Sequence, residues 1–254
     1  MPNTLEFRDL GEGIGDAAAV LRNNAAAAGL DASVPTCPGW RVRDLVTHQG
    51  LVHRWATATV RGVEAPPDAE VEAEAATASD LLDWFDDGLV DLLNALAAAP
   101  ADLDVPFFLL DAPPPRQAWT RRQCHETTIH AIDAMAAKLG RSPRPDELWF
   151  APALARDGID ELLLGFAPRA KYNPRRPEQA TLTVVTDDGL AGWTVTMGPD
   201  GCQASTGAAA DSDAQITASA RALYAGLWNR GRDYTMAGDA ALVEDFLDQL
   251  RITW

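Results

Sequence analysis

The chain has 254 residues, of which 47% are hydrophobic and 23% are charged, and its formal net charge is -16. This composition is typical of a soluble globular protein, and the length suffices for one large domain or two modest ones. The acidic excess occurs in both halves, which disfavours nucleic acid and anionic membranes as partners. No run approaches the roughly 20 apolar residues of a membrane span, and the first residues lack the basic start of a signal peptide. We therefore expect a cytoplasmic protein.

Helical patterns dominate the first half of the chain. We expect helices at about residues 10–28, 42–60, 79–98 and 117–139. Gly29 and Ser79 are residue types that commonly lie just past a helix end and at a helix start. The Pro- and Glu-rich segment 62–75 is expected to be a solvated connection, and the prolines of DAPPPRQ are expected to separate the last two helices. Four helices of this length predict a helical bundle.

The pattern changes after the polar, proline-containing segment GRSPRPDEL, which predicts a boundary between domains at 1–145 and 146–254. Another helix is expected at about 148–166. Short β-branched segments with DDG and PDG turn signals then predict strands at ATLTVVTDD, GWTVTM, CQAST and AQIT. Helices at about 219–228 and 240–250 follow. We predict a multidomain fold, with an N-terminal four-helix bundle and a smaller α+β domain containing an antiparallel sheet.

All four histidines lie on the second and fourth predicted helices. They are His48, His53, His125 and His130, and no histidine follows His130. A general scatter of surface histidines would not usually leave the second half of a chain empty. The clustering therefore favours a site between these two helices.

Five residues of the fourth predicted helix fall within one narrow stripe. Its members are Trp119, Arg122, Glu126, His130 and Asp133. Glu126 and His130 are one turn apart, so their side chains can reach one ion. His48 lies on the apolar face of the second helix, where an ionisable group needs a partner or a ligand. Two alternatives remain open at this point: a hydrogen-bonded core histidine at His48, and a plain ion pair between Arg122 and Glu126.

Ligands of the type His, Glu and His leave a coordination position open, as in catalytic zinc sites, and helical bundles build such sites from facing helices. Asp133 or Asp44 could accept a hydrogen bond from the second ring nitrogen of a ligand histidine.

Four segments resemble one known family. The segment VPTCPGWRVRDLVTHQGLVHRWA resembles the N-terminal motif of the mycothiol-dependent maleylpyruvate isomerase family, within the DinB-like bundle superfamily. The segment RRQCHETTIHAIDA resembles that family's second motif. ELWFAPALARDGIDELLLGF and LYAGLWNRGRDYTMAGD resemble its C-terminal domain, which is similar to sterol carrier proteins. The resemblance covers nearly the whole chain.

The resemblance implies that His48, Glu126 and His130 bind a divalent metal, normally zinc, with nickel and iron left open. It implies mycothiol as the second cofactor, a low-molecular-weight thiol of high-GC actinobacteria, and the Arg- and Ala-rich composition with only two lysines agrees with such a source. Arg230 and Arg232 match a family arginine region, and an arginine can hold a substrate carboxylate bidentately.

The implied chemistry starts from metal-assisted loss of the thiol proton. The expected function is that of a metal- and mycothiol-dependent isomerase, in which a thiolate attacks an unsaturated or electrophilic small acid. One alternative is a mycothiol S-transferase in detoxification or biosynthesis. The other is a non-enzymatic binding protein that carries an apolar small molecule in its C-terminal half.

Overall fold

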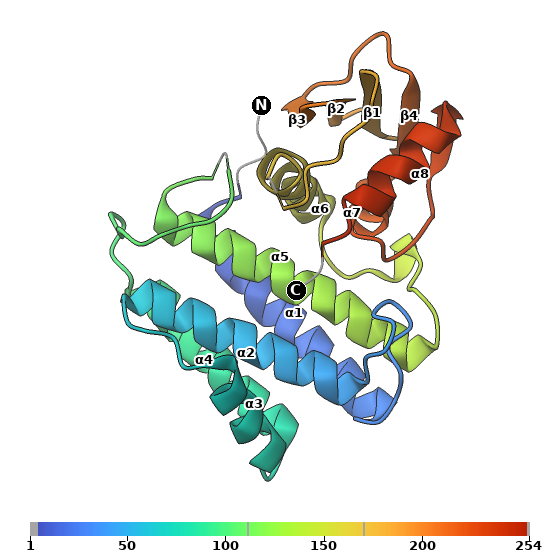
Figure 1. Cartoon of the computed structure of the whole chain (residues 1–254). Helices are drawn as coiled ribbons and strands as arrows, with labels where there is room; N and C mark the ends of the chain where they lie inside the picture. The colour runs from blue at the N-terminus through green and yellow to red at the C-terminus, as the bar shows by residue number, and fades with distance from the viewer. Residues whose placement is uncertain (1–4, 111, 170, 253–254) are drawn as a thin grey trace. The chain divides into compact units, whose positions relative to one another are not determined.

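The structure is a computed structural model that describes residues 5–110, 112–169 and 171–252. The chain divides into two compact units, and Figure 1 shows their elements. The helical unit consists of Glu6–Phe108 and Ala112–Pro143, and the mixed unit consists mainly of the residues from Arg144 onward.

The helical unit contains the four predicted helices. They are α1 (Phe7–Ala28), α2 (Val42–Arg61), α4 (Leu81–Ala98) and α5 (Pro115–Leu139). Helix α5 packs against α1 and α2, and α2 packs against α4. Gly62 and Gly140 end α2 and α5 in the left-handed conformation that favours glycine. The four predicted helices are confirmed.

A fifth helix, α3 (Asp68–Thr77), lies where we expected a solvated connection, and that expectation was wrong. Its sequence DAEVEAEAAT consists largely of good helix formers. Val71 and Ala75, one turn apart, are buried. Two buried positions on an otherwise charged segment give too weak a periodicity to be recognised in the sequence.

Helix α5 is the most enclosed element of the helical unit. Every residue from 122 to 134 is buried, although most of these side chains are polar or ionisable. Buried polar groups require hydrogen-bond partners or ligands. The character of α5 therefore indicates a site, because a purely structural core helix would be apolar.

The mixed unit is built on a five-stranded sheet with the strand order β3-β2-β1-β4-β5. The strands are β1 (Ala180–Thr186), β2 (Gly192–Gly198), β3 (Gly201–Thr206), β4 (Ala214–Ala218) and β5 (Thr235–Gly238). The other elements are a 3-10 turn (Pro145–Glu147), α6 (Pro152–Asp160), a π-helical segment (Glu161–Phe166), α7 (Ala220–Leu227) and α8 (Ala240–Gln249). The predicted α+β class is confirmed.

The sheet is mixed, so the prediction of antiparallel strands was right for three of the four neighbouring pairs and wrong for one. Strand β1 pairs in parallel with β4, and the other neighbouring pairs are antiparallel. Segment 207–213 carries the chain from the β3 edge back past β2 and β1, and Thr194 and Thr183 hydrogen-bond to it. Because of this crossing, β4 begins beside β1 and runs parallel to it.

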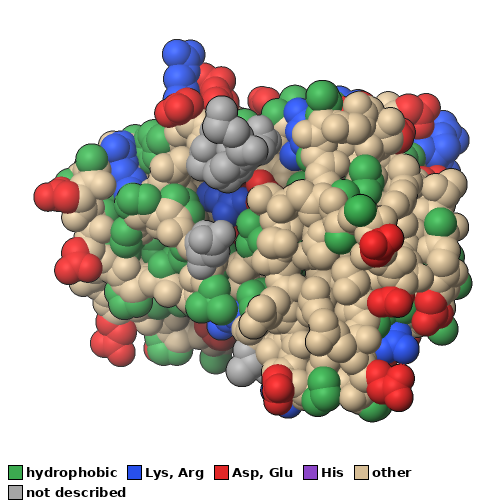
Figure 2. All heavy atoms as spheres, turned by 90° about the horizontal axis from the view of Figure 1, so that it is seen from above, with side chains coloured by type: hydrophobic (Ala, Val, Ile, Leu, Met, Phe, Trp, Pro, Cys, Tyr) green, Lys and Arg blue, Asp and Glu red, His purple; other side chains and the backbone are tan. Residues whose placement is uncertain are grey.

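Acidic side chains are not gathered into one patch on the face that Figure 2 shows. In Figure 2, Asp and Glu side chains occupy several separate places around the face that is shown. Among the helices in the described ranges, none has both the length and the hydropathy that crossing a bilayer requires.

Candidate metal centre

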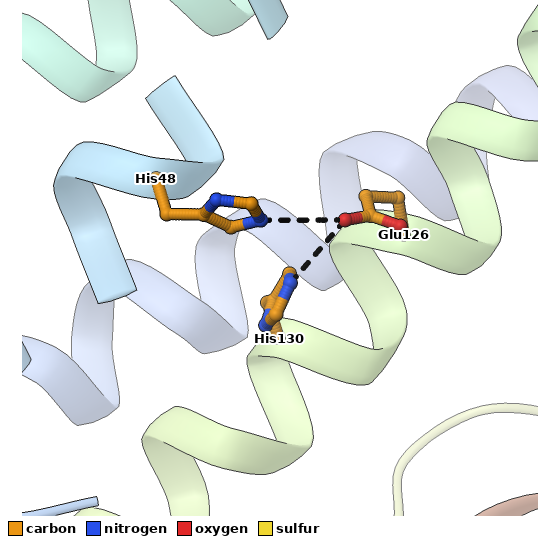
Figure 3. A group of neighbouring side chains, drawn as sticks. All are labelled: His48, Glu126 and His130. Carbon is orange, nitrogen blue, oxygen red and sulfur yellow. Dashed lines mark ion pairs between the residues drawn. The ribbon is translucent and has the colours of Figure 1, made fainter. Parts of the chain in front are cut away.

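Three side chains from two helices of the helical unit converge on one point (Figure 3). His48 comes from α2, and Glu126 and His130 come from α5. Glu126 Oε1 lies 3.6 Å from His48 Nε2 and 3.3 Å from His130 Nε2. The ligand atoms of the three residues all lie within 4.8 Å of one another. The structure therefore brings together the three residues that the sequence singled out.

The arrangement fits a divalent metal. Two ligand atoms on a tetrahedral zinc, each about 2.1 Å from the ion, lie about 3.4 Å apart. The distances from Glu126 Oε1 to the two imidazole nitrogens bracket that value. Glu126 Oε1 is buried, and no group in the described part of the chain gives it a hydrogen bond. A buried carboxylate oxygen of this kind needs a counter-charge, which a metal ion between the three donors would provide.

A second layer of polar contacts orients the three donors. His130 Nδ1 lies 2.9 Å from Asp133 Oδ2, and Thr36 donates a hydrogen bond to the other oxygen of Asp133. The carboxylate thus holds the proton on Nδ1, which leaves Nε2 with a lone pair for a metal. Arg122 donates to Glu126 Oε2 over 2.9 Å, which leaves Oε1 to face the imidazoles.

Asp44, the other acceptor considered from the sequence, accepts from the backbone N–H of Arg41 at the start of α2. It therefore acts as a helix cap, and Asp133 is the carboxylate that contacts His130.

The charges of the centre follow from burial and from these contacts. Burial lowers the pKa of His48, which keeps its imidazole neutral. Burial alone would raise the pKa of Glu126, but the two imidazoles and the Arg122 guanidinium hold that pKa well below its usual value. Burial would also lower the pKa of His130, and the carboxylates of Asp133 and Glu126 outweigh it and raise that pKa. Glu126 is therefore ionised although it is buried.

The loop before α2 forms one wall of the centre. The Trp40 ring lies 5.1 Å from the His48 ring and stacks on His130 at 6.1 Å with an interplanar angle of 20°. Trp40 and His48 also line a groove of about 930 Å³ in the helical unit. The His48 side chain is 16% exposed, against 3% for Glu126 and 4% for His130. A small molecule in the groove therefore meets the centre at His48.

The two arginines predicted to bind substrate belong to the mixed unit. Arg232 forms an exposed ion pair of 2.6 Å with Glu244, and Arg230 donates to the backbone oxygen of Trp228. Their role stays a prediction.

Sequence reasoning missed several residues around the centre. Thr36 and Trp40 lie in the VPTCPGW segment, which carried the family resemblance but no predicted role. Gln49, His53 and Thr127 form a buried hydrogen-bonded group between α2 and α5. The one-turn spacing of Gln49 and His53 on an apolar face was the available signal for this group.

Comparisons with known proteins agree with this architecture. The family model described as "Mycothiol maleylpyruvate isomerase N-terminal domain" matches residues 12–135, and the model described as "MDMPI C-terminal domain" matches residues 153–245. Crystal structures of a mycothiol-dependent maleylpyruvate isomerase and of its histidine-to-alanine mutant are similar in fold, with TM-scores of 0.64 and 0.66. Each is 13% identical in sequence, and each alignment covers 93% of this chain and 95% of the other. A search of curated proteins found no match. Because the two family models together span most of its length, the chain belongs to the mycothiol-dependent maleylpyruvate isomerase family, a family of enzymes.

Proposed function

We propose that this protein is a metal- and mycothiol-dependent enzyme in which a thiolate attacks an unsaturated or electrophilic small molecule. We assign the metal site to domain 1–145, take zinc as its metal, and expect a cytoplasmic location. The observation that carries the proposal is the convergence of His48, Glu126 and His130 around a buried carboxylate oxygen that has no hydrogen bond within the described residues.

His48, Glu126 and His130 would hold the metal. When bound, a divalent metal supplies a Lewis acid that lets a coordinated thiol lose its proton near neutral pH. Two neutral imidazoles and one carboxylate offset only one unit of a divalent charge, so this donor set favours an anionic thiolate over a neutral thiol. Asp133 keeps Nε2 of His130 available as a donor, and Arg122 stabilises the ionised form of Glu126.

Two reactions start from such a thiolate. In an isomerase, the sulfur bonds to one carbon of a conjugated cis double bond and the π electrons move to the conjugated carbonyl oxygen. The resulting single bond rotates, and the returning electrons break the C–S bond, so the thiol is regenerated. In an S-transferase, the neighbouring carbon takes a proton and the thiol stays attached. For an acidic substrate we propose Arg230 and Arg232 as carboxylate contacts.

Metal analysis is the first test. Wild-type protein and a His130→Ala variant would be purified, exposed to zinc, desalted and analysed for metal content. We expect about one metal per chain in the wild type and a large loss in the variant, while a His53→Gln control keeps its metal. A wild-type content below about 0.2 metal per chain would contradict the proposal, because an intact three-ligand site fills under these conditions.

Product analysis separates the two reactions. An isomerase returns free thiol as the trans product accumulates, and a transferase consumes one thiol per product. A non-enzymatic binding protein would show no turnover, and its ligand binding would be unchanged in a His48→Ala variant. Metal-dependent turnover that is lost in that variant would dismiss this alternative.

A further inference from the structure

The groove beside the metal centre is lined by one cation and three carboxylates. The cation is Arg43, and the carboxylates belong to Asp44, Glu72 and Asp80. Arg43 already pairs with Asp31 over 2.6 Å, so its charge is largely offset before any ligand enters. The groove therefore presents a net negative charge to a ligand that approaches His48.

The helix ends around the groove add to its negative charge. The N-termini of α2 and α4 both border it, and a helix N-terminus normally attracts an anion through its free N–H groups. At α4, however, the Asp80 carboxylate accepts from the amides of Leu82 and Asp83. At α2, the Asp44 carboxylate in the first turn accepts from the amide of Arg41, and the amides of Val42 and Arg43 already donate to backbone oxygens. Each N-terminus thus already has its own anion.

The third helix at the groove contributes its opposite end. Ala75 and Ala76, from the last turn of α3, line the groove together with Ala78, which follows that helix. The carbonyl groups of a helix C-terminus carry partial negative charge. Side chains and helix ends therefore agree: the groove offers hydrogen-bond acceptors and repels anions.

We infer that this groove receives the thiol partner and selects thiols that carry no net negative charge, against anionic thiols of similar size. The inference rests on the proposed function, because it assigns the thiol to the groove that reaches the metal centre. Glu72 and Asp80 accept hydrogen bonds from hydroxyl, amide or ammonium groups of the thiol, and Trp40 supplies a flat apolar face beside them. An acidic second reactant then needs its cationic contacts outside this groove.

The test compares two thiols that share one skeleton. Cobalt-loaded protein would be titrated with glutathione, which has two carboxylates and one ammonium group, and with glutathione diethyl ester, which keeps only the ammonium group. Binding would be read from the sulfur-to-cobalt absorption band and corrected for the measured thiolate fraction. We expect the ester to bind roughly tenfold more tightly than glutathione. We also expect high salt to reduce the ratio of the two dissociation constants.

Variants connect the preference to the groove. Glu72→Gln combined with Asp80→Asn should reduce the ratio severalfold, and asparagine keeps the helix cap at position 80. Glu70→Gln is the matched control, because Glu70 is an exposed residue of α3 that does not line the groove. Equal binding of the two thiols, or tighter binding of glutathione, would overturn the inference. A ratio that the double variant leaves unchanged would overturn it as well.

A second measurement does not depend on metal. Quenching of Trp40 fluorescence would be obtained as the difference between wild type and Trp40→Phe, with iodide and with caesium as quenchers. We expect caesium to quench Trp40 more strongly than iodide, relative to a free indole. The reverse order would overturn the charge assignment, whatever the metal content. Failure to hold cobalt would instead contradict the proposed function, and the quenching result would still decide the sign of the groove.

Discussion

Acidification should destabilise the metal-free protein through one buried histidine that is not a proposed ligand. His53 is fully buried on α2, and its Nε2 lies 3.0 Å from Thr127 Oγ1. Thr127 donates its own proton to the Gln123 carbonyl, so it accepts from His53 and fixes the neutral Nε2–H form. Nδ1 is buried with no hydrogen bond among the described residues, and protonation would place an N–H group there. Burial above all, with the nearby Arg54 charge, lowers the pKa of His53 to about 3.

The sign and size follow from linkage. An unfolded histidine has a pKa of about 6.5, so between pH 6.5 and 3 the unfolded state binds more protons than the folded state. The contribution of His53 to stability is therefore complete above this window and is lost as the pH falls through it. The loss is about 1.4 kcal/mol per pH unit, which amounts to about 2 kcal/mol between pH 7 and pH 5.

Urea unfolding with a chelator, at constant ionic strength, measures this loss at pH 7 and pH 5. The reference is His53→Gln, because glutamine can donate to Thr127 and does not titrate. The other titrating groups are the same in both proteins, so their effects largely cancel in the comparison. We expect the wild type to lose about 2 kcal/mol more than the variant on going to pH 5. Losses that agree within about 0.5 kcal/mol would refute the reasoning, because His53 would then bind protons equally in both states.

Three further variants test the site and its support. Asp133→Asn should weaken zinc binding by roughly 10–100-fold in competition with a chromophoric chelator, because the ligand histidine loses the carboxylate that orients it; an unchanged affinity would count against that role. Glu126→Gln should lower the free energy of unfolding of the metal-free protein by about 3–5 kcal/mol in urea, because Arg122 loses a buried carboxylate partner. A loss below about 1 kcal/mol would show that the pair is hydrated. Gly50→Ala should cost about 1–3 kcal/mol in thermal unfolding, since the added Cβ would overlap the Trp84 ring, and a neutral effect would mean that the ring moves freely.

The convergence of the three side chains could be predicted because helical geometry fixes direction over short distances. A spacing of four residues places Glu126 and His130 on one side of α5, and the apolar neighbours of His48 turn it inward on α2. Pattern alone left a core histidine and a plain ion pair as alternatives. The family resemblance was needed to prefer a metal site over both, because residue spacing predicts where a side chain points but not which group it contacts.

The features that the sequence did not predict depend on contacts that leave no periodic pattern in the sequence. Thr36 reaches Asp133 across 97 positions of sequence, from a loop whose conformation is set by its surroundings. Every residue of strand β5 is exposed, so the strand has no alternating apolar pattern and is defined by its pairing with β4. The parallel pairing of β1 and β4 depends on the path of segment 207–213, and strand sequences do not encode their neighbours.

The proposed metal centre requires α2 and α5 to hold one register, because each helix supplies part of the proposed ligand set. An apolar contact between two helices tolerates sliding at small cost, whereas a buried hydrogen-bonded group tolerates very little. Thr127, next to Glu126 in the chain, meets both Gln49 and His53 of α2. A shift of one helical turn along α2 would break both hydrogen bonds in a dry environment and would also withdraw His48 from Glu126. The same buried histidine that makes the fold sensitive to acid therefore helps to set the distance between the metal donors.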